Sequence, residues 1–279
     1  MKYGMLTFNT VSDVVTQRTP FRRLCRAAAA SGVSELDMMT GEVKLYGEKR
    51  VAKALDESGL TLGCLIAHIP MSVTKDDKVA RLTDKSLALA LRLKSPLLMI
   101  VPMTTFGAGK LRPRDKEKIF ENYVKYYTAA VRAAAGSGVT VCFEDTPTCY
   151  LPLSSTDECA RLLNEVDGLG LVFDTANMLP GGSDPTEFYE KLKARVVRAH
   201  LKDARYVQNG QDRCADGRYI ECCDFGSGVV PVRELHDCLA EDNCPAAAIE
   251  YTRPQGHGYA AHAAHILEFM EYIEGRAGC

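Results

Sequence analysis

Tryptophan is absent from this 279-residue chain, and the signals of several other protein classes are missing as well. No apolar run approaches the ~20 residues that a membrane-spanning helix needs. The first residues, MKYGMLTFNT, lead directly into a strand-like segment without the apolar core of a signal peptide, so we expect no secretory leader. The formal net charge of -2 and the pI of about 6.3 offer no basic footprint for nucleic acid. These absences argue against membrane, secreted and nucleic-acid-binding classes.

Eleven cysteines are present, but they show neither zinc-site nor disulfide spacing. No C-x-x-C pair occurs, so a structural zinc site is not indicated. Most lie in apolar segments, such as those around Cys25, Cys64 and Cys142, where a free thiol acts as a small buried hydrophobe. The adjacent Cys222 and Cys223 leave a redox role open. We therefore expect a reduced, cytoplasmic protein.

Apolar runs alternate with amphipathic runs along the whole chain. Strands are predicted near 4–8, 33–38, 61–67, 97–101, 139–144, 170–174, 196–201 and 246–251. Helices are predicted near 20–31, 48–58, 76–93, 115–136, 156–165, 185–194, 231–241 and 259–274. Eight strand–helix units repeating every ~35 residues predict an α/β fold, a single-domain (β/α)₈ TIM barrel over residues 1–279. An open doubly wound sheet is the main alternative, but no G-x-G-x-x-G follows the first strand.

The longest irregular segment, 203–228, follows the seventh predicted strand. Loops of this length inside compact domains are usually functional or disordered. Its tyrosines and cysteines argue against disorder. We therefore predict an irregular segment that covers the mouth of the barrel.

Four side chains that can bind a metal end the last four predicted strands, in VCFE, LVFD, VVRAH and AAAIE. They are Glu144, Asp174, His200 and Glu250, here called the rim quartet. One acidic residue at a strand end is usually a helix cap or a solvated loop residue, but four on consecutive strands indicate a site. Parallel barrel strands end at one shared rim, where active sites of such barrels lie. Carboxylates with one imidazole favour a single divalent metal ion, Mn²⁺ first, then Mg²⁺, Co²⁺ or Zn²⁺.

The segments VCFED, LVFDTAN, VVRAHLKDA and AAIEYTRP, together with the barrel plan, resemble the xylose isomerase-like barrel superfamily. The nearest resemblance is to its sugar (phosphate) isomerase/epimerase group. That resemblance implies that the rim quartet binds one metal ion, and that Glu144 and Glu250 act as acid and base on opposite faces of a bound sugar. The implied activity is isomerisation or epimerisation of a sugar, sugar phosphate or related keto-polyol. It proceeds by proton removal next to a carbonyl, through an enediolate.

One motif departs from the resembling family. There, the metal-binding aspartate is often followed three residues later by a histidine that contacts substrate, whereas here Asp174 is followed by Asn177. Asparagine can hydrogen-bond a hydroxyl but cannot carry a proton at neutral pH. The departure leaves the substrate undetermined, and the absence of tryptophan removes one residue type that stacks on sugars.

The candidate substrate contacts are His68, Asn177, Lys202, Arg253 and His257. His68 ends the third predicted strand and so lies on the same rim, although a structural histidine is an equal alternative. Lys202 follows the metal histidine in HLKD and could contact a substrate oxygen or pair with Asp203 instead. Arg253 and His257 lie in the loop after the last strand, where they could hold a phosphate or carboxylate. Simple solvation of that loop is the alternative.

Three other functions stay open from the sequence. A lyase, either an inosose-type dehydratase or a C-glycoside-cleaving enzyme, would use the same proton removal and then expel a β-substituent. An apurinic-site endonuclease has the same barrel but binds three zinc ions and needs more histidines than the six present. A non-catalytic sugar-binding barrel would not need the complete rim quartet. The expected partner is a small carbohydrate, without nucleic acid or membrane, and a homo-oligomer is left open.

Overall fold

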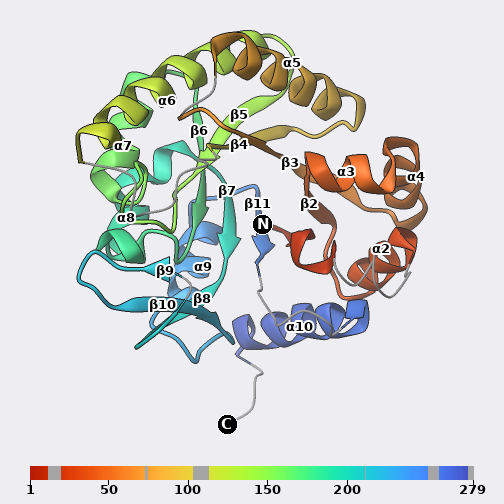
Figure 1. Cartoon of the computed structure of the whole chain (residues 1–279). Coiled ribbons are helices and arrows are strands. Elements are labelled where there is room, and N and C mark those ends of the chain that lie inside the picture. Colours follow the sequence, from red (N-terminus) through yellow and green to blue (C-terminus); the bar gives the residue numbers. More distant parts are fainter. Residues whose placement is uncertain (12–19, 73–74, 103–112, 211, 251–257, 276–279) are drawn as a thin grey trace.

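Eight parallel strands close into a barrel in the order β1-β11-β7-β6-β5-β4-β3-β2 (Figure 1). The computed structural model describes residues 1–11, 20–72, 75–102, 113–210, 212–250 and 258–275. The barrel strands are β1 (Lys2–Leu6), β2 (Glu35–Met39), β3 (Thr61–Ile69), β4 (Leu97–Pro102), β5 (Thr140–Glu144), β6 (Gly170–Asp174), β7 (Val196–Leu201) and β11 (Ala246–Ile249). The predicted (β/α)₈ TIM barrel is confirmed.

A helix follows each barrel strand and packs on the outside of the barrel (Figure 1). These helices are α2 (Phe21–Ala30), α4 (Glu48–Ser58), α5 (Asp76–Arg92), α6 (Pro113–Ala134), α7 (Thr156–Glu165), α8 (Pro185–Leu192), α9 (Val232–Glu241) and α10 (Gly258–Ile273). Each turns an apolar stripe toward the strands, as in α7, where Cys159, Leu162 and Leu163 are buried at helical spacing. An additional short helix, α3 (Thr40–Tyr46), was not predicted.

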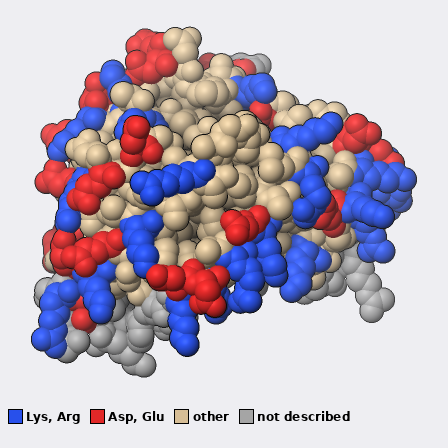
Figure 2. Space-filling model, turned by 90° about the horizontal axis from the view of Figure 1, so that it is seen from above, with Lys and Arg blue, Asp and Glu red and all other residues tan. Residues whose placement is uncertain are grey.

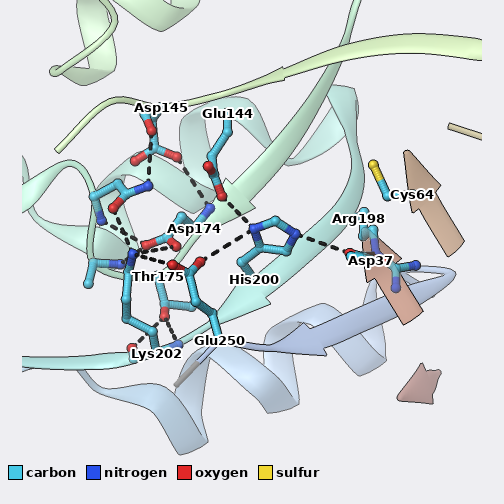
Figure 3. Close-up of polar contacts among 12 residues, drawn as sticks. Asp37, Cys64, Glu144, Asp145, Asp174, Thr175, Arg198, His200, Lys202 and Glu250 are labelled. Atoms are coloured by element: carbon cyan, nitrogen blue, oxygen red, sulfur yellow. Dashed lines mark hydrogen bonds and ion pairs between the residues drawn. The ribbon is translucent and has the colours of Figure 1, made fainter. Parts of the chain in front are cut away.

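Alternate residues of each barrel strand point into the barrel or toward the helices. In β7, Ala199 and Leu201 belong to the large core between strands and helices, whereas Arg198 and His200 face inward (Figure 3). A separate apolar cluster, here called the apolar half of the interior, comes mainly from β3 to β6. Its buried members are Leu6, Cys64, Ile66, Leu97, Met99, Cys142 and Val172. The same alternation turns Glu144 and Asp174 inward, because they lie two residues beyond Cys142 and Val172.

Residues 203–228 contain a small antiparallel sheet, so the prediction of an irregular segment was wrong. Its strands are β8 (Asp203–Val207), β9 (Asp212–Arg213) and β10 (Tyr219–Cys223), in the order β8-β10-β9. The strands are too short and too polar for a period-2 pattern to stand out in the sequence, and local antiparallel pairing holds them. One residue, Lys202, separates this sheet from β7. Cys149, in the loop after β5, donates a hydrogen bond to the carbonyl of Arg213 at 3.2 Å.

Acidic and basic side chains are interspersed over the face of the molecule in Figure 2. Outer helices carry exposed ion pairs of opposite charge, such as Arg161 of α7 with Glu117 and Glu165. Exposed pairs of this kind stabilise the fold by at most about 1 kcal/mol each. Among the described helices, none combines the length and apolarity needed to cross a bilayer.

Candidate metal centre

Strand register brings the rim quartet to one level of the barrel. Asp174 at the end of β6 is paired with His200 of β7. Ile249 of β11 is paired with Leu201, and the next residue, Glu250, donates its N–H to the Leu201 carbonyl at 2.9 Å. One donor atom from each member of the quartet lies within 4.8 Å of the others (Figure 3).

The quartet is almost closed off from solvent. Asp174 and His200 are fully buried, and the side chain of Glu144 is 16% exposed at the rim. His200 contacts Glu144 through Nδ1, which also lies 3.6 Å from Glu250 Oε2. Because Nδ1 faces two carboxylates of the quartet, it is the imidazole atom available to a metal ion.

A local turn orients Asp174. Its Oδ1 accepts hydrogen bonds from the N–H groups of Ala176 and Asn177 at 2.8 and 2.9 Å, as aspartate does where it ends a strand. The other oxygen, Oδ2, lies 2.9 Å from Lys202 Nζ but has no hydrogen bond of acceptable geometry within the described part of the chain. A buried carboxylate oxygen aimed at the centre of the quartet is suited to metal ligation.

Lys202 is the cation of the site. Its buried ammonium lies 2.9 Å from Asp174 Oδ2 and 3.4 Å from Glu250 Oε1, and it donates to Asn177 Oδ1 at 2.8 Å. Burial lowers the pKa of Lys202, but the charges of Asp174 and Glu250 outweigh it and hold the pKa well above its ordinary value. The expected alternative pairing with Asp203 is wrong. Asp203 instead accepts N–H groups of the loop that follows β10, from Gly226 at 2.9 Å and Gly228 at 3.0 Å.

Asn177 holds Lys202 in place. Its Oδ1 accepts from the Lys202 ammonium, and its Nδ2 donates to the Asp145 carbonyl at 3.0 Å. Both ends of the amide are therefore engaged by the protein. Where a histidine would offer a titratable ring, this chain offers an amide that orients a lysine.

The charge of the site matches a divalent cation. Burial raises the pKa of Glu250 to about 7, although Lys202 lowers it. Burial and the charge of Asp174 also raise the pKa of Asp145 well above its usual range, and this residue was not predicted from the sequence. The single ammonium of Lys202 does not balance the carboxylates gathered here, which a metal ion would stabilise as anions. Oxygen and nitrogen donors from four side chains fit such an ion.

The remaining predicted substrate contacts are His68, Arg253 and His257. His68 is in β3 with its side chain accessible at the rim. Desolvation lowers its pKa, while the charge of Glu144 raises it. His68 shares the inward face of β3 with Cys64 and Ile66. Arg253 and His257 fall outside the described residues.

A buried ionic layer beneath the quartet was also missed. Here called the ionic half of the interior, it consists of Glu35, Asp37 and Arg198, and it meets His200 of the quartet through Asp37. The available signal was the spacing: Glu35 and Asp37 lie two apart in a buried strand, as do Arg198 and His200. Side chains two apart in a strand share a face. Which partners they meet depends on the closure of the barrel.

Comparison with known proteins supports the same architecture. The family model described as xylose isomerase-like TIM barrel matches residues 24–272. No curated protein sequence matches the chain.

Solved structures resemble the chain over nearly its whole length. The probable 3-DHS dehydratase AsbF of Bacillus anthracis has a TM-score of 0.73 and 16% identity, covering 97% of this chain and 98% of AsbF. The IolI protein, solved with a bound zinc atom, has a TM-score of 0.75 and 16% identity over 100% and 99% of the two chains. D-psicose 3-epimerase of Clostridium cellulolyticum H10 has a TM-score of 0.74 and 14% identity over 100% of both chains. At these identities the likeness establishes the fold.

Proposed function

The chain belongs to the xylose isomerase-like TIM barrel family, and from that premise we propose that it is a divalent-metal-dependent isomerase or epimerase. The substrate class is a sugar, a sugar phosphate or a related keto-polyol. One observation carries the proposal: four donor atoms from consecutive strands converge within 4.8 Å at the carboxyl rim of the barrel. The active sites of such barrels lie at this rim.

The rim quartet would hold the metal ion, with His200 contributing Nδ1 and Asp174 contributing Oδ2. A bound divalent cation supplies Lewis acidity toward the carbonyl and hydroxyl oxygens of the substrate. Carboxylates with one imidazole favour Mn²⁺ first, with Mg²⁺, Co²⁺ and Zn²⁺ as alternatives. The bound zinc atom of the IolI protein supports metal binding on this barrel without deciding the ion used here.

Glu144 and Glu250 are the proposed acid and base. They approach the site from β5 and β11, with β6 and β7 between them, so their carboxylates reach a bound substrate from two sides (Figure 3). One carboxylate removes the proton from the carbon next to the carbonyl, and the other returns a proton to the same or the neighbouring carbon. Carboxylates positioned in this way act as general acids and bases.

The remaining contacts would fix the substrate. Lys202 presents its ammonium beside Glu250 and can donate to a substrate oxygen, while Asn177 orients it from behind. His68, accessible on the same rim near Glu144, is a further proposed contact. Arg253 and His257 stay predictions for an anionic group of the substrate.

Lys202 also supports a second candidate, a lyase. Its buried ammonium lies 3.4 Å from Glu250 Oε1 and could donate a proton to a departing β-substituent. Removal of the proton next to the carbonyl would be the shared first step. The two activities differ in their products, since the lyase releases water or another leaving group.

Metal analysis followed by turnover in D₂O tests the proposal. The purified protein is assayed with ketoses, their phosphates and keto-polyols, each with added Mn²⁺, and deuterium incorporation is followed by NMR. The isomerase proposal expects a divalent ion at one per chain and deuterium in product and recovered substrate, without loss of water. Release of a leaving group instead would establish the lyase.

Two isosteric variants test the proton-transfer roles. Glu144→Gln and Glu250→Gln should each lower kcat by about 10²–10⁴-fold, since each removes one acid–base group. Glu221→Gln is the control, because Glu221 is an exposed carboxylate of β10 paired with Arg205. Full activity in both rim variants would overturn the mechanism.

A further inference from the structure

We infer that Asp37, held by Arg198, is a positioning residue for His200: it accepts the Nε2–H of the imidazole and so turns Nδ1 toward the metal. This inference rests on the proposed metal site. It concerns a residue of β2, whereas the rim quartet comes from β5, β6, β7 and the residue after β11.

The contact crosses the interior of the barrel. Asp37 Oδ2 lies 3.2 Å from His200 Nε2, and both side chains are fully buried (Figure 3). On the other side of the ring, Nδ1 faces Glu144 and Glu250. The two nitrogens of His200 are therefore divided between the rim quartet and Asp37.

Arg198 determines the direction of that hydrogen bond. Its Nε donates to the same Asp37 oxygen, Oδ2, at 2.6 Å. A guanidinium stays protonated, so this oxygen already acts as an acceptor. The hydrogen between Asp37 and His200 consequently belongs to Nε2, so a metal ion would bind at Nδ1, in place of the proton that Nδ1 shares with Glu144. Metal-ligating histidines commonly donate their second N–H to a carboxylate in this way.

Arg198 is itself held in place by Glu35. Its Nη1 donates to Glu35 Oε2 at 2.7 Å, and Lys2 Nζ lies 3.0 Å from Glu35 Oε1. Two carboxylates are thus balanced by two cations along a line from the lower end of the barrel to His200. Asp37 cannot turn away from His200 without breaking its bond to Arg198.

Two glycines leave room for the guanidinium. A Cβ added at Gly4 would lie 2.5 Å from Arg198 Nη2, and one at Gly63 would lie 2.7 Å from the same atom. Neither distance is sterically allowed. The strands on either side of β2, which are β1 and β3, therefore carry glycine where the guanidinium of Arg198 needs space.

Filling space does not account for this layer. Well-packed apolar residues of similar volume are often as stabilising as a buried ion pair, or more so. The apolar half shows that the same barrel accommodates such residues elsewhere. The ionic layer meets His200 through Asp37, which favours a role in orienting the ligand.

Metal affinity, measured together with unfolding, distinguishes a role of Asp37 in orienting His200 from a general role in stability. Zn²⁺ and Mn²⁺ binding to the full chain is measured by calorimetry for wild type, Asp37→Asn and Glu42→Gln. Asp37→Asn should weaken binding by about 10–100-fold, the usual loss for such a partner. Glu42→Gln alters a buried carboxylate that is hydrogen-bonded to Thr7 and the Met39 N–H, outside the contacts of His200 and Arg198, so its affinity should stay within about twofold, or 0.4 kcal/mol. Urea unfolding of each protein shows which variants are folded.

The wild-type chain allows a test that needs no variant. In the Zn²⁺-loaded protein with ¹⁵N-labelled histidine, NMR should show metal on Nδ1 of His200 and a proton on Nε2. Metal on Nε2, or an unchanged affinity in folded Asp37→Asn, would overturn this inference and leave the proposed function standing. Failure of wild type to bind either ion would overturn both.

Discussion

The interior of the barrel is divided into two halves that share one set of strands and differ in chemistry. In the apolar half, Met99, Cys142 and their neighbours pack without charge. In the ionic half, Arg198 lies between two carboxylates and is equally buried. Both halves lie beneath the same rim, but Asp37 links the ionic half to His200 of the rim quartet through a polar contact.

The contrast shows that a buried position inside this barrel can carry either an apolar or a charged side chain, depending on the strand to which it belongs. A barrel can fill its interior with apolar side chains at little risk, whereas each buried charge needs a partner of opposite sign. The ionic half is complementary within itself, so its members depend on one another. The predictions below test that dependence, beginning with the largest expected effect.

Arg198→Met should destabilise the fold by about 3–5 kcal/mol, because it leaves Asp37 and Glu35 buried without their shared cation. Urea unfolding measures the change. Arg205→Met is the matched control, since the pair between Arg205 and Glu221 is exposed and worth about 1 kcal/mol or less. Equal losses of unfolding free energy in the two variants would show that the residues of the buried layer do not depend on one another.

Glu42 provides a buried carboxylate that forms no ion pair with the described residues, in contrast to Asp37. Its hydrogen bonds come from Thr7 Oγ1 and Met39 N–H, both at 2.8 Å, and burial raises its pKa from 4.5 to about 7. The folded state therefore holds the proton more tightly than the unfolded state. This contribution to stability is complete below pH ~4.5 and is lost as the pH rises through ~7, by up to about 3 kcal/mol.

Glu42→Gln should flatten this pH dependence. The amide can accept from Met39 N–H and donate to Thr7 Oγ1, so it mimics the protonated acid. Urea unfolding between pH 5 and pH 8 compares the two proteins. If the free energy of unfolding changed with pH equally in both proteins, the pH dependence would belong to other groups.

Gly63→Ala should destabilise the protein by about 1–3 kcal/mol through overpacking. The added Cβ would lie 2.6 Å from Glu35 Oε2 and 2.8 Å from Arg198 Nη1. Gly41→Ala is the control, because nothing lies within 4 Å of its added Cβ and Gly41 is helical. There alanine should be neutral or stabilising by up to about 1 kcal/mol. Thermal unfolding distinguishes the two, and a tolerated Gly63→Ala would mean that the ionic half can shift.

Met99→Leu in the apolar half should have the smallest effect, less than about 1.5 kcal/mol, because it conserves volume and removes no charge partner. Metal affinity, measured by calorimetry, should be unchanged. A loss of affinity as large as that expected for Asp37→Asn would erase the distinction between the halves.

Much of the architecture could be predicted from the sequence because it depends on local periodicity. The strand predicted at 170–174 is β6, and the helix predicted at 156–165 is α7. The rim position of the quartet follows from parallel strands alone, since each member ends a strand or lies within a residue of its end. The sheet of β8, β9 and β10 escaped prediction because its strands are short and interrupted by turns.

What the sequence by itself determined was the alternation of strands and helices, and with it the barrel and the convergence of Glu144, Asp174, His200 and Glu250 on one rim. Tertiary structure alone decided which atoms meet. Arg198 and Asp37 are 161 residues apart in the chain, and their contact exists only because the barrel closes. The pairing of β6 with β7 likewise placed Lys202 against Asn177 instead of Asp203. Periodicity specifies the face of a strand on which a side chain lies, whereas its partner across the interior depends on the register of all eight strands.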